Sequence, residues 1–122
     1  MKKLSLKASC LCGSVQIKTQ GYHRNIKNCH CIQCMKTHGH YAAYTSVEEQ
    51  NIKLIKKRTL KWFRSSKRAK RGFCNKCGAS IFFKIIGTKN IHLQTFLAYF
   101  WYYQPLKLAL VYLFLYSYLQ SL

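Results

Sequence analysis

The sequence predicts a small, mainly β domain of short strands with few helices, stabilised by metal ions. Three observations support this prediction. The chain has 122 residues, enough for one domain with a modest core to which bound metal would add stability. Apolar and polar residues alternate over several short segments, which is the period of a strand. The seven cysteines lie in three close clusters, a spacing typical of metal half-sites.

The first half of the chain predicts two strands separated by a metal-binding loop. Residues 8–20 open with a tight turn at Gly13, which holds the first cysteine pair, and continue as an alternating strand that Gly21 ends. Residues 29–40 form a loop rich in thiols and histidines, and residues 41–47 form the next strand.

The second half predicts further strands around the last cysteine pair. In residues 52–64 cationic and apolar positions alternate, which predicts one or two strands. Residues 65–72 are expected to be a polar, basic connection that leads into the turn with the last cysteine pair. Residues 79–86 then form an apolar strand.

Two of the cysteine clusters together offer the four ligands of a closed tetrahedral site, which in zinc proteins is usually structural. The glycines just beyond each pair, Gly13 and Gly78, permit the backbone to turn toward the sulfurs. The alternative is four buried free cysteines. The candidate ligands of this structural zinc are Cys10, Cys12, Cys74 and Cys77.

The third cluster would leave a second zinc ion with one open coordination position, and open sites usually do chemistry. Its candidate ligands are Cys29, Cys31 and Cys34. The alternative is a second structural zinc that a histidine completes: His30, His38, His40 or a more distant one. His38 and His40 flank Gly39 and are placed to serve as proton carriers over the site, unless they are solvated loop residues.

The charge balance restricts both chemistry and partners. The chain has 21 lysines and arginines but only two acidic residues, Glu48 and Glu49, for a formal net charge of +19. These adjacent carboxylates, in a predicted turn, exclude a hydrolase with paired carboxylates, so catalysis would depend on zinc, with histidine or water moving protons. The positive surface favours anionic partners: nucleic acid, a membrane surface or a small acidic substrate.

A basic segment supports an alternative function. Ten lysines and arginines lie between Lys53 and Arg71, interleaved with Trp62 and Phe63. Positive charge with stacking aromatics is typical of nucleic-acid binding. A non-catalytic zinc module that binds nucleic acid or another polyanion is therefore the alternative to an enzyme. A solvated strand face with its apolar residues in the core would explain the same pattern.

The thiols and the ends of the chain bear on location. An odd number of cysteines at metal-type spacings argues against disulfides and predicts a reducing, cytoplasmic compartment. The first residues lack the apolar segment of a signal peptide. The last 30 residues are hydrophobic and aromatic, but Gln104, Pro105 and Lys107 divide them into runs of about nine, whereas a membrane span wants roughly 18 uninterrupted apolar residues. A tail-anchored membrane protein is the alternative. We expect a zinc domain in residues 1–92 and a tail in residues 93–122 that packs or aggregates.

Several motifs occur together in a specific order: Cys10-Leu-Cys-Gly-Ser-Val, Asn28-Cys-His-Cys-Ile-Gln-Cys with Thr37-His-Gly39 behind it, Ser65-Ser66, and Arg71-Gly-Phe-Cys-Asn-Lys-Cys-Gly78. In order and spacing this set resembles the glutathione-dependent formaldehyde-activating enzyme family, whose domain centromere protein V shares. The resemblance covers roughly residues 6–92.

The resemblance implies a zinc-bound β-tent of short antiparallel strands, with two zinc ions per chain. It implies that the four-cysteine set holds the structural zinc and that Cys29, Cys31 and Cys34 hold the catalytic one. It further implies that the partners are glutathione and formaldehyde, joined into S-hydroxymethylglutathione by an enzyme classed in reverse as a carbon–sulfur lyase. A zinc-dependent lyase of this kind is the leading prediction.

The chain departs from the family near its end. Relatives continue with a Gly-x-x-Asp-type segment and further strands with acidic residues, whereas Lys89-Asn-Ile-His92 is followed here by an aromatic sequence. We expect a shifted reading frame or a degenerated gene end at this point. Loss of strands that close the tent would impair the enzyme.

Overall fold

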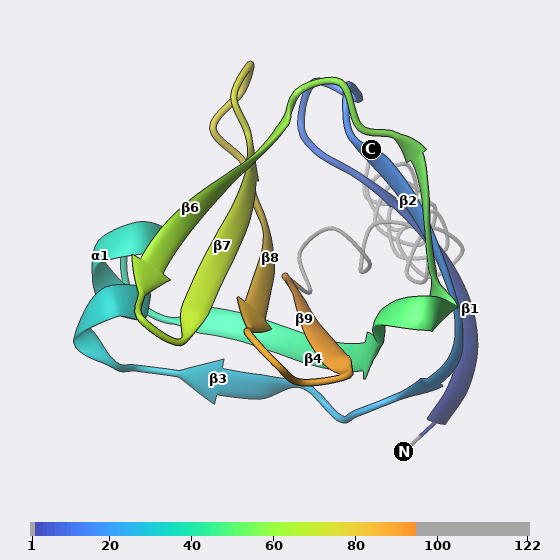
Figure 1. Ribbon diagram of the computed structural model, residues 1–122, viewed down its shortest axis with the longest axis horizontal. Helices are drawn as coiled ribbons and strands as arrows, with labels where there is room; N and C mark the ends of the chain where they lie inside the picture. The colour runs from blue at the N-terminus through green and yellow to red at the C-terminus, as the bar shows by residue number, and fades with distance from the viewer. Residues whose placement is uncertain (1, 95–122) are drawn as a thin grey trace, which may run out of the picture.

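The computed structural model describes residues 2–94, which form two antiparallel sheets and little helix (Figure 1). The smaller sheet has three strands, in the order β1 (Lys2–Ser9), β2 (Gln16–His23) and β5 (Ile52–Lys56). The larger sheet has six, in the order β3 (Lys27–Cys29), β4 (Ala42–Glu48), β9 (Asn90–Gln94), β8 (Ser80–Ile85), β7 (Ala69–Cys74) and β6 (Leu60–Ser66). The helices are α1 (Ile32–His38) and the single 3-10 turn η1 (Glu49–Asn51). The predicted mainly β, antiparallel fold is confirmed.

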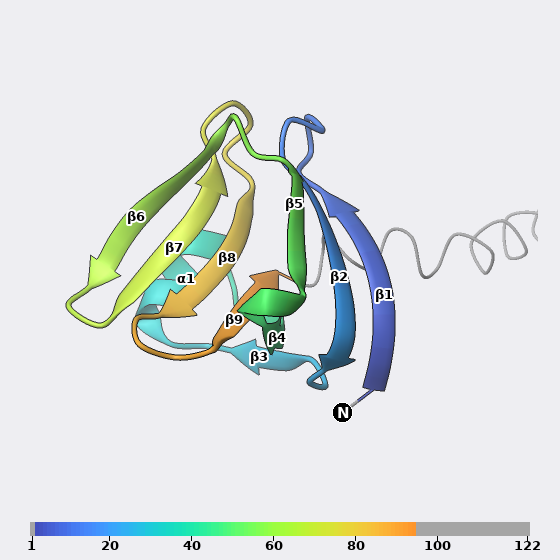
Figure 2. The same ribbon diagram turned by 45° about the vertical axis from the view of Figure 1, so that its right-hand side comes forward.

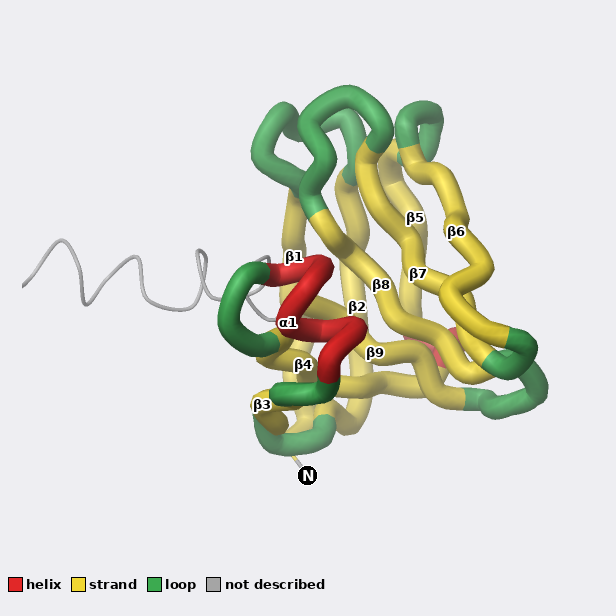
Figure 3. The backbone as a smooth tube through the Cα atoms, turned by 90° about the vertical axis from the view of Figure 1, so that its left-hand side faces the viewer, coloured by secondary structure: helices red, strands yellow, loops and turns green. Residues whose placement is uncertain are grey.

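The two sheets converge at one end of the molecule and spread apart at the other (Figure 2). The turn between β1 and β2 and the turn between β7 and β8 lie at the converging end. Helix α1 lies over the face of the six-stranded sheet (Figure 3), where Cys34 packs with Ala42, Tyr44 and Phe83. The converging end and the helix-covered face of the larger sheet therefore carry different cysteine clusters.

The core lies between the sheets because strand residues alternate between inward and outward positions. Its most buried large side chains, Ile81 and Phe82, are each 1% exposed. The apolar residues of this cluster are Ala8, Val15, Ile17, Val47, Ile81, Phe82, Ile91 and Leu93.

One row of the larger sheet shows why a glycine stands in β7. Trp62, Gly72 and Phe82 are direct partners on neighbouring strands. The rings of Trp62 and Phe82 stack across the glycine, with centroids 5.6 Å apart and planes 13° apart. A Cβ on Gly72 would lie 3.0 Å from Cδ2 of Phe82 and 3.2 Å from Cζ3 of Trp62. Gly72 thus makes room for the stacked pair.

Three expectations about local structure were wrong. Residues 29–40 are not all loop, because α1 forms where one helical turn places Cys31 and Cys34 on the same side. Residues 65–72 are not a connection, because β6 continues to Ser66 and β7 begins at Ala69 after a short turn. Gly21 does not end β2, which continues through it with a φ of 117°. A Cβ on Gly21 would lie only 2.9 Å from Nδ2 of Asn51, so a side chain at this position would crowd Asn51.

Other expected strands are present with slightly different bounds. Residues 41–47 correspond to β4, residues 52–64 divide into β5 and β6, and residues 79–86 correspond to β8. Strand β9 ends at Gln94, two residues past the predicted boundary at residue 92. The interpretations of the tail concern residues 95–122, which lie outside the described residues. In residues 2–94 no helix has the length and apolar character to cross a membrane.

Candidate metal centres

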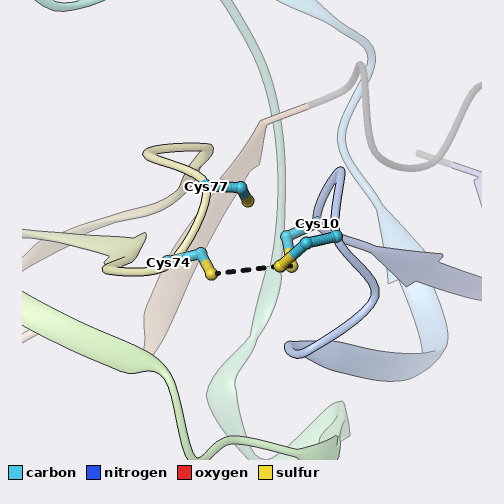
Figure 4. A group of neighbouring side chains, drawn as sticks. Cys10, Cys74 and Cys77 are labelled. Carbon is cyan, nitrogen blue, oxygen red and sulfur yellow. Dashed lines mark hydrogen bonds between the residues drawn. The ribbon is translucent and has the colours of Figure 1, made fainter.

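The converging end of the sheets brings four thiols together from two distant parts of the chain. The sulfurs of this four-thiol site, Cys10, Cys12, Cys74 and Cys77, all lie within 4.8 Å of one another. In Figure 4 the labelled side chains, from turns on opposite sheets, point toward one shared space. The four predicted ligands therefore converge in the fold.

Sulfur–sulfur distances in the four-thiol site fit a tetrahedral metal. The Sγ atom of Cys12 lies 3.6 Å from that of Cys10 and 3.7 Å from that of Cys74. With zinc–sulfur bonds of about 2.3 Å, the edge of a tetrahedron is about 3.8 Å. The all-thiolate donor set is also one that zinc prefers. The residues present therefore fit a zinc ion.

The two turns that carry these thiols have matching backbone hydrogen bonds. The N–H of Cys10 donates to the oxygen of Val15 at 3.0 Å, and the N–H of Cys74 donates to the oxygen of Ala79 at 3.0 Å. The glycine after each pair donates back to the first cysteine of its turn. Gly13 and Gly78 have φ values of 70° and 71°, which a residue with a side chain rarely adopts. Each pair is thus fixed by its local sequence.

The thiols of this site differ in how readily they lose a proton. Burial raises the pKa of Cys10 to about 11, although the backbone N–H of Val15, 3.2 Å from the sulfur, opposes the shift. At Cys74 burial acts in the same direction, but hydrogen bonds from Thr59 and from the backbone outweigh it and lower the pKa to about 6. Without a cation the Cys10 thiol would keep its proton at neutral pH. A divalent ion supplies the missing positive charge and replaces the proton.

The second cluster lies where β3 ends and α1 begins. Its three sulfurs, those of Cys29, Cys31 and Cys34, lie within 4.8 Å of one another, and we call it the three-thiol site. No histidine, aspartate or glutamate of residues 2–94 joins the group. Cys34 is 4% exposed, whereas Cys31 is exposed. The site therefore has a buried side and a side that faces the solvent.

The protonation of the three thiols differs across the site. Burial raises the pKa of Cys34 to about 11, while a hydrogen bond from Arg71 acts against this rise. Hydrogen bonds from the backbone and the side chain of Cys34 lower the pKa of the exposed Cys31. The buried sulfur thus needs a nearby cation more than the exposed one does.

Arg71 lies behind Cys34 and is only 6% exposed. Its Nη2 donates to Sγ of Cys34 at 3.7 Å and to Oε1 of Gln33 at 3.4 Å. Its Nη1 donates to the hydroxyl oxygen of Tyr44 at 3.3 Å, and its guanidinium lies over the ring of Phe83, 5.0 Å from the centroid. A cation is therefore built into the buried side of the three-thiol site.

His38 is tied to this group through Tyr44. The Tyr44 hydroxyl lies 3.1 Å from Nε2 of His38, and Nδ1 of His38 lies 3.3 Å from the backbone oxygen of Cys34. Burial lowers the pKa of His38, which favours its neutral ring. The Thr37 hydroxyl, 2.7 Å from Nδ1, donates its own hydrogen to the backbone oxygen of Gln33. Both neighbours of Nδ1 therefore accept, so Nδ1 carries the proton and Nε2 accepts a hydrogen bond from the Tyr44 hydroxyl. The hydroxyl oxygen in turn accepts from Arg71.

The other histidines are not gathered at the sulfurs. His30 and His40 are exposed and pack against each other and Tyr41, with ring centroids 5.2 to 5.6 Å apart. His23 is buried and hydrogen-bonded to Thr19 at 2.8 Å. None of them belongs to the three-thiol group, so the alternative of a histidine-completed site gains no support from the described residues.

Sequence reasoning missed Tyr44 and Arg71. Arg71 was counted among the ten cations of a basic segment, yet it is buried, whereas all the others except Lys70 are exposed. Strand alternation was the available signal, because it would have placed every second residue of 69–74 toward the protein. Tyr44 gave no signal beyond being an aromatic residue in a strand.

The basic segment is a surface in the fold, and several of its large apolar side chains are exposed there. Ile55 is 51% exposed, Trp62 40% and Phe63 61%. Strands β5 and β6 are edge strands of their sheets, so only one side of each is paired. The expectation that the apolar residues of this segment are core holds for Ala69, which is buried, and for Leu60, which packs on the core, but not for Ile55 and Phe63.

Comparisons with known proteins bear on fold and family. The family model described as glutathione-dependent formaldehyde-activating enzyme matches residues 5–98. A crystal structure of a Rhodobacter sphaeroides protein, a structural genomics target, superposes with a TM-score of 0.64 at 19% identity. The match covers 75% of this chain and 86% of that one, and it supports the fold alone. No curated protein matches the sequence.

Proposed function

The chain belongs to the glutathione-dependent formaldehyde-activating enzyme family, and from this membership and the three-thiol site we propose that it is a zinc-dependent carbon–sulfur lyase-type enzyme. In the synthetic direction the sulfur of glutathione adds to the carbon of formaldehyde, and the thiol proton ends on the former carbonyl oxygen. In the lyase direction the carbon–sulfur bond of S-hydroxymethylglutathione breaks and the hydroxyl proton returns to sulfur. The reaction is neither an oxidation nor a reduction.

One observation carries the proposal. Three thiols converge within 4.8 Å, with no fourth side-chain ligand among the described residues, and one of them, Cys31, is exposed. Such a set suits a zinc ion that retains an open position, whereas the four-thiol site suits a closed structural ion. We therefore propose two zinc ions per chain, with the chemistry at the three-thiol site.

Bound zinc would supply a Lewis acid and a docking point for a thiolate or a carbonyl oxygen, although three thiolate ligands make it a weak one. The chain would contribute mainly by positioning. The exposed side at Cys31 admits the substrate, while the buried side is closed by Cys34, Tyr44 and Arg71. The excess of positive charge attracts glutathione, which is an anion at neutral pH.

We propose that His38 handles the proton of the reaction through Tyr44. Its two ring nitrogens are engaged, Nδ1 with the backbone oxygen of Cys34 and Nε2 with the Tyr44 hydroxyl. Because burial raises the pKa of Tyr44, its hydroxyl keeps its own proton at rest and would pass it to Nε2 only as the oxygen takes up another proton from the substrate. His38 would thus act through Tyr44 rather than as a metal ligand.

Exchange spectroscopy by NMR tests this function. Glutathione, formaldehyde and their adduct interconvert in water, so the quantity to measure is the increase in exchange rate per mole of zinc-loaded protein. Wild type should accelerate the exchange, and Cys31→Ala should return it to the uncatalysed rate. Ile32→Ala, a change at the neighbouring exposed side chain, is the matched control and should remain active. An unchanged rate in Cys31→Ala would refute the site assignment.

Polyanion binding is a second candidate function, favoured by one observation. Strand β6 presents Phe63, 61% exposed, between the exposed Lys61 and Arg64 at the edge of its sheet. If bases stack on this ring, Phe63→Ala should weaken binding to a single-stranded oligonucleotide by about fivefold or more. Affinity that depends on salt but not on Phe63 would show attraction by charge alone and would contradict stacking on this strand.

The thiol chemistry also bears on the cellular compartment of the protein. Seven unpaired cysteines that must remain thiolates for metal binding suit a reducing environment. We therefore propose a cytoplasmic location, which cell fractionation would test.

A further inference from the structure

Arg71 is a buried cation without a carboxylate partner. The sequence contains only two acidic side chains, and both are exposed in the fold. Glu49 forms an ion pair with Lys84, and Glu48 accepts a hydrogen bond from Gln50. Burial of an unpaired charge is strongly unfavourable, so a guanidinium that is 6% exposed must be compensated by something other than a carboxylate.

The contacts of the guanidinium show what could compensate it. Its partners are two neutral oxygens, on Gln33 and Tyr44, and one sulfur, on Cys34. Only the sulfur can carry a negative charge at neutral pH. Nε of Arg71 is buried without a hydrogen-bond partner, so the neutral contacts do not even satisfy all its donors.

We propose that Arg71 is the counter-ion of the three-thiol metal site. Three thiolates around one divalent zinc carry a net charge of minus one, and the guanidinium behind Cys34 neutralises it. The same guanidinium donates a hydrogen bond to the Cys34 sulfur and so orients this sulfur within the site. Arg71 acts through Cys34 and is therefore a positioning residue. The inference rests on the proposed zinc at this site and extends it to a residue outside the ligand set.

Because the proposed role of Arg71 depends on its charge, variants of similar size but different charge should behave differently. Arg71→Lys keeps the charge, whereas Arg71→Met keeps a long stem without it. Tyr44→Phe removes a hydrogen-bond partner but leaves the cation in place. Lys70→Met is the matched control, because Lys70 lies next along β7 and its Nζ lies over Trp62, 4.5 Å from the ring centroid.

The first experiment is competition with a chromophoric zinc chelator, with the four-thiol site as an internal reference. Partners outside the ligand set typically change metal affinity ten- to a hundredfold. Arg71→Met should weaken zinc binding at the three-thiol site by about that factor and leave the four-thiol site unchanged. Arg71→Lys should recover most of the loss, and Lys70→Met should bind like wild type. Wild-type affinity in Arg71→Met, or equal losses in the Lys and Met variants, would overturn the proposal.

A second experiment uses the sign of a stability change. In Cys31→Ala the metal at the three-thiol site is lost, so Arg71 is left without its counter-charge. Adding Arg71→Met should then stabilise the protein against urea, whereas the same change should destabilise the zinc-loaded wild type. Destabilisation of equal size in both backgrounds would contradict a counter-ion role. Both experiments omit substrate, so their failure would leave the proposed reaction standing, and loss of the reaction would not affect them.

Discussion

The sulfur of Cys12 lies 3.7 Å from the sulfur of Cys74, although 62 residues separate them in the chain. Cys12 follows the first strand of the three-stranded sheet, and Cys74 ends β7 of the six-stranded sheet. A metal ion between them would tie the two sheets at the end where they converge (Figure 2). The four-thiol site is thus placed to stabilise the fold.

Loss of the four-thiol site should therefore destabilise the whole domain. We predict that Cys12→Ser lowers the free energy of unfolding by about 4 kcal/mol or more, the range expected for loss of a structural metal. Urea denaturation of the variant and of zinc-loaded wild type measures this difference in the free energy of unfolding. Leu11→Ala, a change at an exposed side chain in the same turn, is the control and should change stability little. A Cys12→Ser protein as stable as wild type would show that the apolar core alone holds the sheets together.

Loss of the three-thiol site should remove a zinc ion without unfolding the domain. Cys31 is exposed at the start of α1, and no described residue of the main core depends on it. Cys31→Ala is predicted to remove one zinc equivalent and to destabilise the domain less than Cys12→Ser does, the main cost being that the buried Arg71 loses its counter-charge. Metal analysis and urea denaturation of the same samples check both quantities. Cooperative loss of structure in this variant would count against separate roles for the two sites.

The stacked pair over Gly72 gives a prediction about the core. In Gly72→Ala the new methyl group would meet Phe82 at 3.0 to 3.1 Å, so the buried ring must move. Overpacking of this kind typically costs about 1–3 kcal/mol. The double variant with Phe82→Leu should recover part of this cost, because the smaller side chain vacates the space. Strict additivity of the two stability changes would contradict the contact.

A further prediction concerns pH. Burial, and to a smaller extent the charge of Arg24, lower the pKa of His92, whose ring packs against Phe83 and Tyr44. A lowered pKa in the folded state means that the unfolded chain binds the proton more tightly. Stability from this group is thus fully present above the unfolded pKa of about 6.5 and is lost as the pH falls from that value through the lower pKa of the folded state.

The difference between wild type and His92→Gln isolates this effect, because the metal ligands titrate in both proteins. Between pH 7 and pH 5.5 wild type should lose more stability than the variant, by less than about 1.4 kcal/mol per pH unit. Parallel pH profiles would show that His92 titrates normally in the fold.

The sequence predicted what depends on local pattern. The spacing of Cys10 and Cys12, and of Cys74 and Cys77, is set by short turns, so both half-sites could be recognised before the fold was known. Strand β4 was likewise evident from its composition. The helix around Cys34 was missed because its seven residues, about two turns, are too few to show a period.

What depends on pairing between distant strands could not be predicted. Arg71 meets Cys34 only because β7 lies in the sheet that α1 covers, 37 residues away in the chain. Charge counting placed Arg71 with its solvated neighbours, since composition does not reveal which face of a strand a residue occupies. The engagement of His38 with Tyr44 depends in the same way on tertiary packing.

The central claim is that the three-thiol site holds a zinc ion with an open position for the thiol substrate. Zinc stoichiometry by native mass spectrometry, with and without added glutathione, tests it most directly. We predict two equivalents in wild type, one of them labile and exchangeable with thiol ligands, and a single, inert equivalent in Cys31→Ala. One tight equivalent in wild type, unaffected by glutathione or by the loss of Cys31, would contradict the claim.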